Sequence, residues 1–415
     1  MNAAEAAQSR PGWMERWGVP ALDQPGAPVF VLALLIHSIG NGLFYSFVLI
    51  YFNRVVGLPL TQVGLALTTA SAIGLLANPI AGQIVDRVGA KRMVVLSQII
   101  QAVGYAGYFL ADSIALVVVV TLISMFGERV FWVAFPTLVA VISPPGERDR
   151  WFAFTTAIRN AGLGAGGLLA GLVIGIAGSD GYRILLGANV AGFTIAATLL
   201  TVRVPNIGER PRSIDHGGYR QVLRDRPAMT IAGANVLFAY CALMAFFALP
   251  VFVVETLDLP AWSVGFYFAL NTALLALGQT LAFRAVHGWR RTRILFAAGM
   301  IWAVTSALFA TALALPRSVL LPYLAVIVAI YTLGELIHAP TATSLVASLA
   351  PDNLRGRYLA MISLSWSIAQ TVGPALFTGL LAWNDLAPWV ATALIAIAGG
   401  LLARSAGPYI PAELE

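Results

Sequence analysis

The chain has 415 residues, of which 59% are hydrophobic and only 11% are charged, with 25 basic residues against 19 acidic ones. A soluble domain carries about 25% charged residues, so this chain has too few to cover a water-facing surface. The composition excludes an ordinary soluble enzyme or binding domain and indicates a protein that spans a membrane.

Twelve apolar stretches follow one another along the chain, each long enough to cross a hydrocarbon core of roughly 30 Å as a helix. They run over 28–53, 60–85, 92–111, 114–142, 150–178, 183–203, 228–254, 261–285, 293–315, 318–348, 355–382 and 386–404. Helices and closed barrels satisfy the backbone in lipid, and these stretches are far too long for barrel strands. The sequence therefore predicts an all-α membrane protein with twelve transmembrane helices.

Residues 1–27 are interpreted as a cytoplasmic N-terminal tail, because they lack the basic head, apolar run and cleavage site of a signal peptide. With this tail in the cytoplasm, twenty of the 25 basic residues lie on the cytoplasmic side, and only Arg54, Arg183 and Arg317 lie outside. The positive-inside rule then predicts a multi-pass protein of the cytoplasmic membrane with both termini inside. The basic charge reflects this topology, and no nucleic-acid partner is expected.

The first span carries a polar pair, His37 and Asn41, spaced four residues apart on one helical face. Polar groups inside a membrane span usually face a cavity or bond to a neighbouring helix. Contact with substrate or water and a buried structural histidine are both open readings of this pair.

The loop between the second and third spans has a distinctive pattern of glycines and charges. Its residues are Gly82, Asp86, Arg87, Gly89, Lys91 and Arg92. In this position the pattern Gly-x-x-x-Asp-Arg-x-Gly-x-Lys/Arg-Arg resembles the signature of the major facilitator superfamily of transporters. The resemblance implies two pseudo-symmetric six-helix bundles and a gating role for Asp86, which can accept from the start of the eleventh span near Asn353. A loop that only sets the topology is the alternative.

Charged residues within spans begin with Glu128 and Arg129 in the fourth span and Arg159 in the fifth. Neighbouring helical residues point about 100° apart, so Glu128 and Arg129 are not both expected to face a central cavity. One of them is expected to pair sideways with the fifth span, and Arg159 is the plausible partner of Glu128. A structural ion pair and a direct role in coupling are both open. Arg129 also resembles, weakly, the arginine of a helix-four motif in drug/proton antiporters.

A polar stretch at 205–227 separates six spans from six and is interpreted as a cytoplasmic linker. It divides an N-terminal six-helix bundle, 28–204, from a C-terminal one, 228–405, which is followed by a short cytoplasmic tail, 406–415. The two halves are related by an internal repeat. Gly127-Glu128 recurs as Gly334-Glu335 at a shift of 207, and Leu58-Pro59 recurs as Leu259-Pro260 at a shift of 201.

Glu335 is the strongest candidate for proton exchange, because it lies near mid-depth in the span 318–348. An apolar environment favours the neutral carboxylic acid over the carboxylate, so this group can exchange a proton near physiological pH. His338, three residues on, is close enough to share or relay that proton. Neutralisation of Glu335 by Arg129 or Arg159 is the structural alternative. The stretch 331–335 also resembles helix ten of LmrP-type proton-coupled multidrug exporters, which implies a role in coupling or cation recognition.

The function predicted from these residues is secondary active transport, namely proton-coupled export of amphipathic or cationic drug-like compounds by alternating access. The alternative is a proton-coupled transporter of a specific metabolite, such as a sugar, peptide, lipid or organic ion. The chain carries no nucleotide-binding loop, catalytic elbow or cluster of metal-ligating residues. No enzymatic activity, cofactor or metal is therefore expected. A monomer is predicted, with a small-molecule substrate, protons and the lipid bilayer as its partners and a proton gradient as the driving force.

Overall fold

The computed structural model describes residues 20, 22–75, 88–144, 147–205, 219–286, 288–351 and 354–411. Within this part of the chain the regular elements are all helical. The first half contains α3 (Ala27–Phe44), α5 (Leu60–Leu75), α7 (Ala90–Gly107), α8 (Ile114–Ile142), α9 (Arg148–Ala177) and α10 (Ser179–Arg203). The second half contains α12 (Arg226–Val251), α13 (Trp262–Ala285), α14 (Arg291–Thr311), α15 (Arg317–Leu349), α16 (Arg355–Trp383) and α17 (Ala387–Ala406).

These helices confirm the predicted fold of twelve spans in two six-helix bundles. Ten helices of the described part are long and apolar enough to cross a membrane. Of the other two, α5 is a shorter apolar helix that ends just before the undescribed segment 76–87. The other, α13, is 24 residues long but carries polar side chains such as Asn271 and Gln279.

The internal repeat extends to the backbone at the end of each half's first helix. After α3 the chain continues to a π-helical turn, η2 (Tyr51–Val55), and after α12 it continues to another, η4 (Phe252–Thr256). Each turn is followed by a residue with positive φ, Gly57 at 82° and Asp258 at 50°. These positions differ by the same 201 residues as the Leu-Pro repeat, so the two halves end their first helices in the same way.

The connection between the halves contains a short helix, α11 (Tyr219–Arg224), within the polar stretch 205–227 that is predicted to be a linker. Asp225 caps the following α12, since its carboxylate accepts from the Ala228 amide at 3.1 Å and Pro227 occupies the first turn. The Tyr358 hydroxyl of α16 also donates to Asp225, at 2.7 Å. The cap therefore fixes where the second half begins and joins that point to α16.

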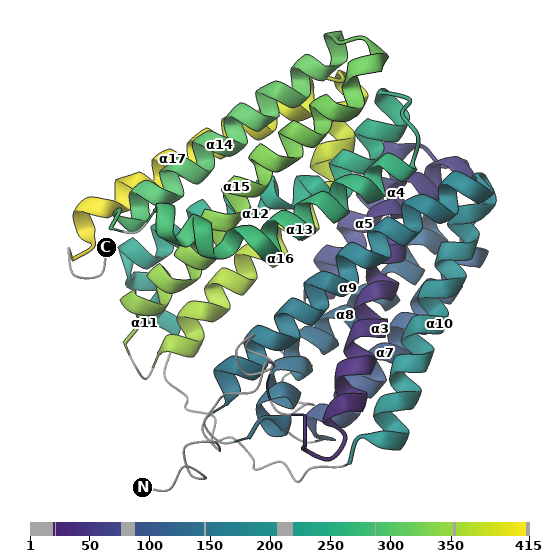
Figure 1. Cartoon of the computed structure of the whole chain (residues 1–415), viewed down its shortest axis with the longest axis horizontal. Coiled ribbons are helices and arrows are strands. Elements are labelled where there is room, and N and C mark those ends of the chain that lie inside the picture. The colour runs from purple at the N-terminus through teal and green to yellow at the C-terminus, as the bar shows by residue number, and fades with distance from the viewer. Residues whose placement is uncertain are drawn as a thin grey trace, which may run out of the picture.

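The two halves meet along α9 with α13 and along α5 with α16. In Figure 1 their ribbons diverge toward the end where α3 begins and α11 lies, here called the near end, and converge toward the opposite end. That opposite end, the far end, holds η2 and η4. The inter-half contacts described below lie between mid-depth and the far end, so the halves are joined more closely there.

Only part of the predicted signature loop lies in the described chain. Gly82, Asp86 and Arg87 fall outside the described residues, as does Asn353, the expected partner region of Asp86. Gly89, with φ of 98°, precedes α7, and the Lys91 amine donates to the Thr201 carbonyl of α10 at 3.3 Å. The gating role of Asp86 therefore stays a prediction.

Candidate functional site

Glu335 lies on α15 at mid-depth and is half-buried. Its Oε2 accepts from the Asn271 amide of α13 at 2.6 Å. Its Oε1 lies 3.4 Å from the Tyr331 hydroxyl, whose single proton is donated to the Ala242 carbonyl of α12 at 2.6 Å. Asn271 also donates to the Thr332 hydroxyl at 2.9 Å, which fixes the orientation of the amide. The carboxyl group thus has a neutral hydrogen-bond donor, Asn271, and a donor of this kind is compatible with both a charged and a protonated acid.

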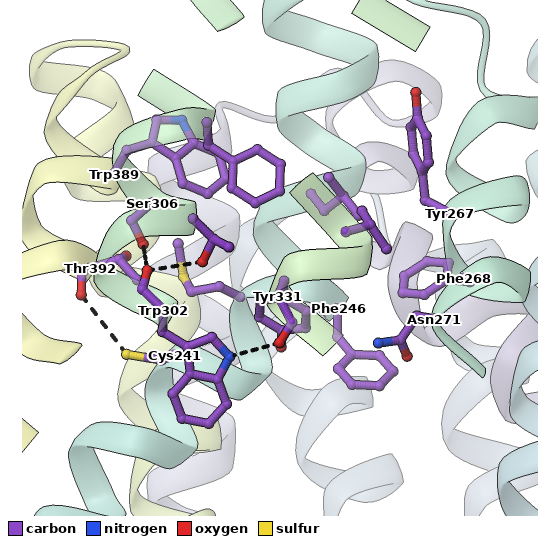
Figure 2. Close-up of a pocket in the computed structure, with 15 residues that line it drawn as sticks. Cys241, Phe246, Tyr267, Phe268, Asn271, Trp302, Ser306, Tyr331, Trp389 and Thr392 are labelled. Carbon is purple, nitrogen blue, oxygen red and sulfur yellow. Dashed lines mark hydrogen bonds between the residues drawn. The ribbon is translucent and has the colours of Figure 1, made fainter. Parts of the chain in front are cut away.

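A pocket lies beside this group, between α12, α13, α14, α15 and α17. Asn271 and Tyr331 line it, so the donor to Glu335 and the neighbouring tyrosine also face the cavity. Figure 2 shows Phe246, Phe268 and Asn271 together on one side and Trp302, Cys241 and Thr392 on the other. The wall is mainly aromatic with a few hydroxyl and amide groups, which is the composition of a pocket for an amphipathic ligand.

His338 does not contact Glu335, contrary to the expectation that the two share or relay a proton. Its Nε2 is 3.0 Å from Oδ1 of Asn235 on α12, and its ring lies 5.0 Å from Phe238 and 5.1 Å from Trp302. Only 1% of the residue is exposed. The three-residue spacing places both residues on one side of α15, but the imidazole packs among aromatic rings toward α12 and α14 instead. His338 is a buried, hydrogen-bonded histidine.

The polar pair on α3 bonds internally and to a neighbouring helix. His37 Nδ1 lies 2.9 Å from Oε1 of Gln98 on α7, and the Asn41 amide lies 3.1 Å from His37 Nε2. An amide oxygen only accepts and an amide nitrogen only donates, so these partners assign Nδ1 as the protonated nitrogen. The ring also stacks on Phe131, with centroids 4.4 Å apart. These contacts support the structural reading of His37 over direct contact with substrate.

Glu128 and Arg129 contact the other half of the molecule. Arg129 Nη1 donates to the Ser367 hydroxyl of α16 at 2.9 Å. Gln370, one turn further along α16, donates to Glu128 Oε1 at 3.2 Å and to the Tyr45 hydroxyl at 2.7 Å. The expectation that one of the two α8 residues pairs sideways with α9 is therefore wrong. Both instead join the halves at mid-depth.

Arg159 makes a different contact from the predicted ion pair with Glu128. Its guanidinium lies over the ring of Trp132 on α8, 4.5 Å from the centroid. Trp132 is 44% exposed, so the stacked pair lies at an open part of the helix surface. Sequence spacing placed Arg159 at the right depth, but side-chain direction on α9 leads it to the indole.

An ion pair at the far end was not singled out in the sequence. Arg54 in η2 and Glu255 in η4 approach to 2.7 Å, and Arg54 also donates to the Val254 carbonyl at 3.3 Å. The two residues occupy equivalent positions of the repeat, since 255 − 54 = 201. Opposite charges at equivalent positions meet where the two halves adjoin. The Leu58-Pro59 repeat contained the signal, because extending it by four residues aligns Arg54 with Glu255.

A double-mutant cycle measures this ion pair. We expect Arg54→Glu to lower the thermal unfolding midpoint of the purified protein, and the swapped pair Arg54→Glu with Glu255→Arg to recover most of the loss. The side chains are 42% and 20% exposed, so the coupling energy is expected to be about 0.5–1 kcal/mol. Additive effects of the two single changes would show that the pair does not join the halves.

The glycines of α9 pack against two different helices, α3 and α13. A Cβ on Gly166 would lie against the Ile39 carbonyl of α3, whereas one on Gly164 would lie 2.5 Å from the Thr272 hydroxyl of α13 in the other half. From the α13 side, a Cβ on Gly265 would lie 2.7 Å from the Gly167 carbonyl oxygen. Close helix packing in membranes depends on such small residues. Here they bring two helices from different halves into backbone contact.

Comparison with known proteins identifies what this arrangement is similar to. The sequence profile described as Major Facilitator Superfamily matches residues 30–374. A Na⁺, Li⁺, K⁺/H⁺ antiporter of Planococcus maritimus is 24% identical over 367 residues, covering 80% of this chain and 83% of that protein. The multidrug resistance protein MdtH of Aeromonas hydrophila is 26% identical over 346 residues, covering 81% of each chain.

Solved structures of transporters share the fold at lower identity. A variant of the peptide transporter POT in complex with alafosfalin superposes with a TM-score of 0.75 and 16% identity, covering 93% of this chain and 95% of that chain. A variant of the nucleoside transporter NupG gives 0.74 and 13%, with coverage of 93% and 100%. A D-xylose-proton symporter gives 0.70 and 16%, with coverage of 91% and 96%.

Proposed function

Because the chain belongs to the major facilitator superfamily of secondary active transporters, we propose that it exports amphipathic or cationic drug-like compounds in exchange for protons. The observation that carries this proposal is the position of Glu335. It is a carboxylic acid in the middle of a mainly apolar span, and its donor Asn271 and the neighbouring Tyr331 line an aromatic cavity. Ionisable side chains at such depth are costly and mark ion or substrate pathways.

The proposed cycle uses this one carboxyl group for two tasks. With Glu335 ionised, a substrate cation is attracted to the aromatic cavity, where the rings contribute cation–π contacts. Protonation of Glu335 from the outside removes that attraction and releases the substrate. Release of the proton to the cytoplasm then resets the cavity. In this proposal both termini and the near end face the cytoplasm, so the halves diverge toward the side from which substrate is taken.

Two relatives of low identity bear on the proposal, one on exchange with protons and the other on drugs as substrates. One is named as a cation/proton antiporter and the other as a multidrug resistance protein. These names suggest two substrate classes, metal cations and organic drugs. The aromatic lining of the cavity favours organic molecules, because a small hard cation needs a compact set of oxygen ligands rather than apolar walls.

Proton movement in proteoliposomes tests the proposal. The purified protein is reconstituted with a pH-sensitive dye inside, and a panel of lipophilic cations, neutral drugs and the chlorides of sodium, lithium and potassium is added in turn. Substrate-evoked pH changes for several unrelated drugs are expected. A response to alkali cations alone, or to no drug while the protein remains folded, would contradict drug export and favour a specific metabolite or ion as substrate.

A further inference from the structure

The guanidinium of Arg129 has hydrogen-bonding capacity that the described part of the chain leaves unused. Only 5% of the residue is exposed, and one nitrogen, Nη1, donates to Ser367. The other two, Nε and Nη2, are buried and make no hydrogen bond with any described residue. Buried donors of a charged group are rarely left without a partner, because their desolvation is not compensated. A missing partner for these two nitrogens is therefore indicated.

The geometry of the two free donors suggests what that partner is. Nε and Nη2 form one edge of the planar guanidinium, and their N–H bonds point in parallel from it. This edge matches the two oxygens of a carboxylate or the oxygens of a phosphonate, which it can hold bidentately. Ser367 on the opposite half holds Nη1, so the orientation of the edge is set by an inter-half contact.

The local charge also favours an anion. Mid-span charges on the first half comprise two arginines, Arg129 and Arg159, and one carboxylate, Glu128. Glu128, the one carboxylate among them, accepts from Gln370 and makes no hydrogen bond with the free edge of Arg129. Arg159 is stacked on Trp132. An anion placed there would neutralise the remaining positive charge in a low-dielectric region, where the attraction is strong.

We propose that Arg129 is an anion-binding residue for the transported substrate, which gives the transporter a preference, among the amphipathic compounds proposed above, for those that also carry a carboxylate or phosphonate. This inference rests on the proposed transport function and deepens it. The acidic group is held by Nε and Nη2 of Arg129 at the boundary between the halves. Because the same guanidinium also donates to Ser367, substrate binding affects a hydrogen bond that joins the two halves.

Equilibrium binding in detergent at a fixed pH, without any proton gradient, tests this site. The probes are three acids, ciprofloxacin, cholate and N-acetyl-phenylalanine, each paired with its methyl ester. The wild-type protein is expected to bind at least one acid about ten-fold more tightly than the ester. In Arg129→Gln the two members of the pair should bind equally. Arg129→Lys keeps the positive charge but loses the two parallel N–H donors, so an intermediate preference for the acid is expected.

Controls separate the anion site from general effects. Arg404→Gln changes an arginine that lies on the ring of Phe296, outside the site, and should preserve the preference for the acid. Binding of ethidium, which carries no acid, reports whether the variants are folded. Equal affinity for acid and ester in the wild type, or a preference that survives in Arg129→Gln, would overturn the proposal. Such a result together with intact substrate-evoked proton movement would contradict the anion site but not the proposed transport function.

Discussion

Glu335→Gln is expected to reduce substrate-evoked proton movement in proteoliposomes to the level of protein-free vesicles. The amide has nearly the same shape and can still accept from Asn271, whose nitrogen lies 2.6 Å from the carboxyl oxygen in the wild type. It has no proton to release, however, so binding and release of a proton can no longer accompany the transport cycle. Exchange of labelled substrate across the membrane without a gradient should persist, because the cavity wall is unchanged.

Two further variants make the Glu335 experiment specific. Glu335→Asp keeps a titratable group and should retain part of the proton movement. Glu128→Gln changes the repeat mate, which accepts from Gln370 of the other half and so has a different environment. Proton movement that survives in Glu335→Gln but disappears in Glu128→Gln would transfer the coupling role to the first half.

Gly265→Leu is expected to force the far ends of the two halves apart. A Cβ at this position would lie 2.7 Å from the Gly167 carbonyl oxygen and 3.0 Å from Leu168 Cα, both backbone atoms that cannot rotate away. Overpacking of this kind costs about 1–3 kcal/mol, and the cost applies only while α9 and α13 are in contact. It therefore disfavours the conformation described here relative to one in which the far end is open. Substrate transport should fall because alternating access needs both conformations.

Spin-label distances measure this effect directly. Labels at Asp112→Cys and Asp385→Cys report the far-end separation of the two halves, and both positions are exposed. The native Cys241 is only 1% exposed, so it should not compete for the label. Gly379→Leu is the matched control, since a Cβ there would meet nothing within 4 Å. An unchanged distance distribution in the Gly265 variant would mean that α9 and α13 do not control closure of the far end.

Glu335 and Gly265 act on different requirements of transport. Glu335 concerns the energy source, because it is the group proposed to carry the proton. Gly265 concerns the conformational change, because it sets how closely the halves approach. We expect Glu335→Gln to lose coupling to protons but to keep both conformations. We expect Gly265→Leu to lose one conformation but to keep the titratable group. Together the two variants separate these requirements.

Much of the fold follows from the sequence alone. The predicted span 114–142 coincides with α8, and 355–382 differs from α16 by one residue at its end. This accuracy has a physical reason: the bilayer demands about twenty apolar residues per helix and full backbone hydrogen bonding, so span positions depend on local composition. The repeat at shifts of 201 and 207 likewise indicates two related bundles without any knowledge of contacts.

The sequence also determined which ionisable groups lie at mid-depth, because depth is counted along a helix. It did not determine their partners. Glu128 was assigned to Arg159, and His338 to Glu335, yet the structure pairs Glu128 with Gln370 and His338 with Asn235. Those partners lie 242 and 103 residues away along the chain. Only the tertiary structure could choose them, because side-chain direction depends on how each helix is rotated against its neighbours, and that rotation is set by packing across the whole bundle.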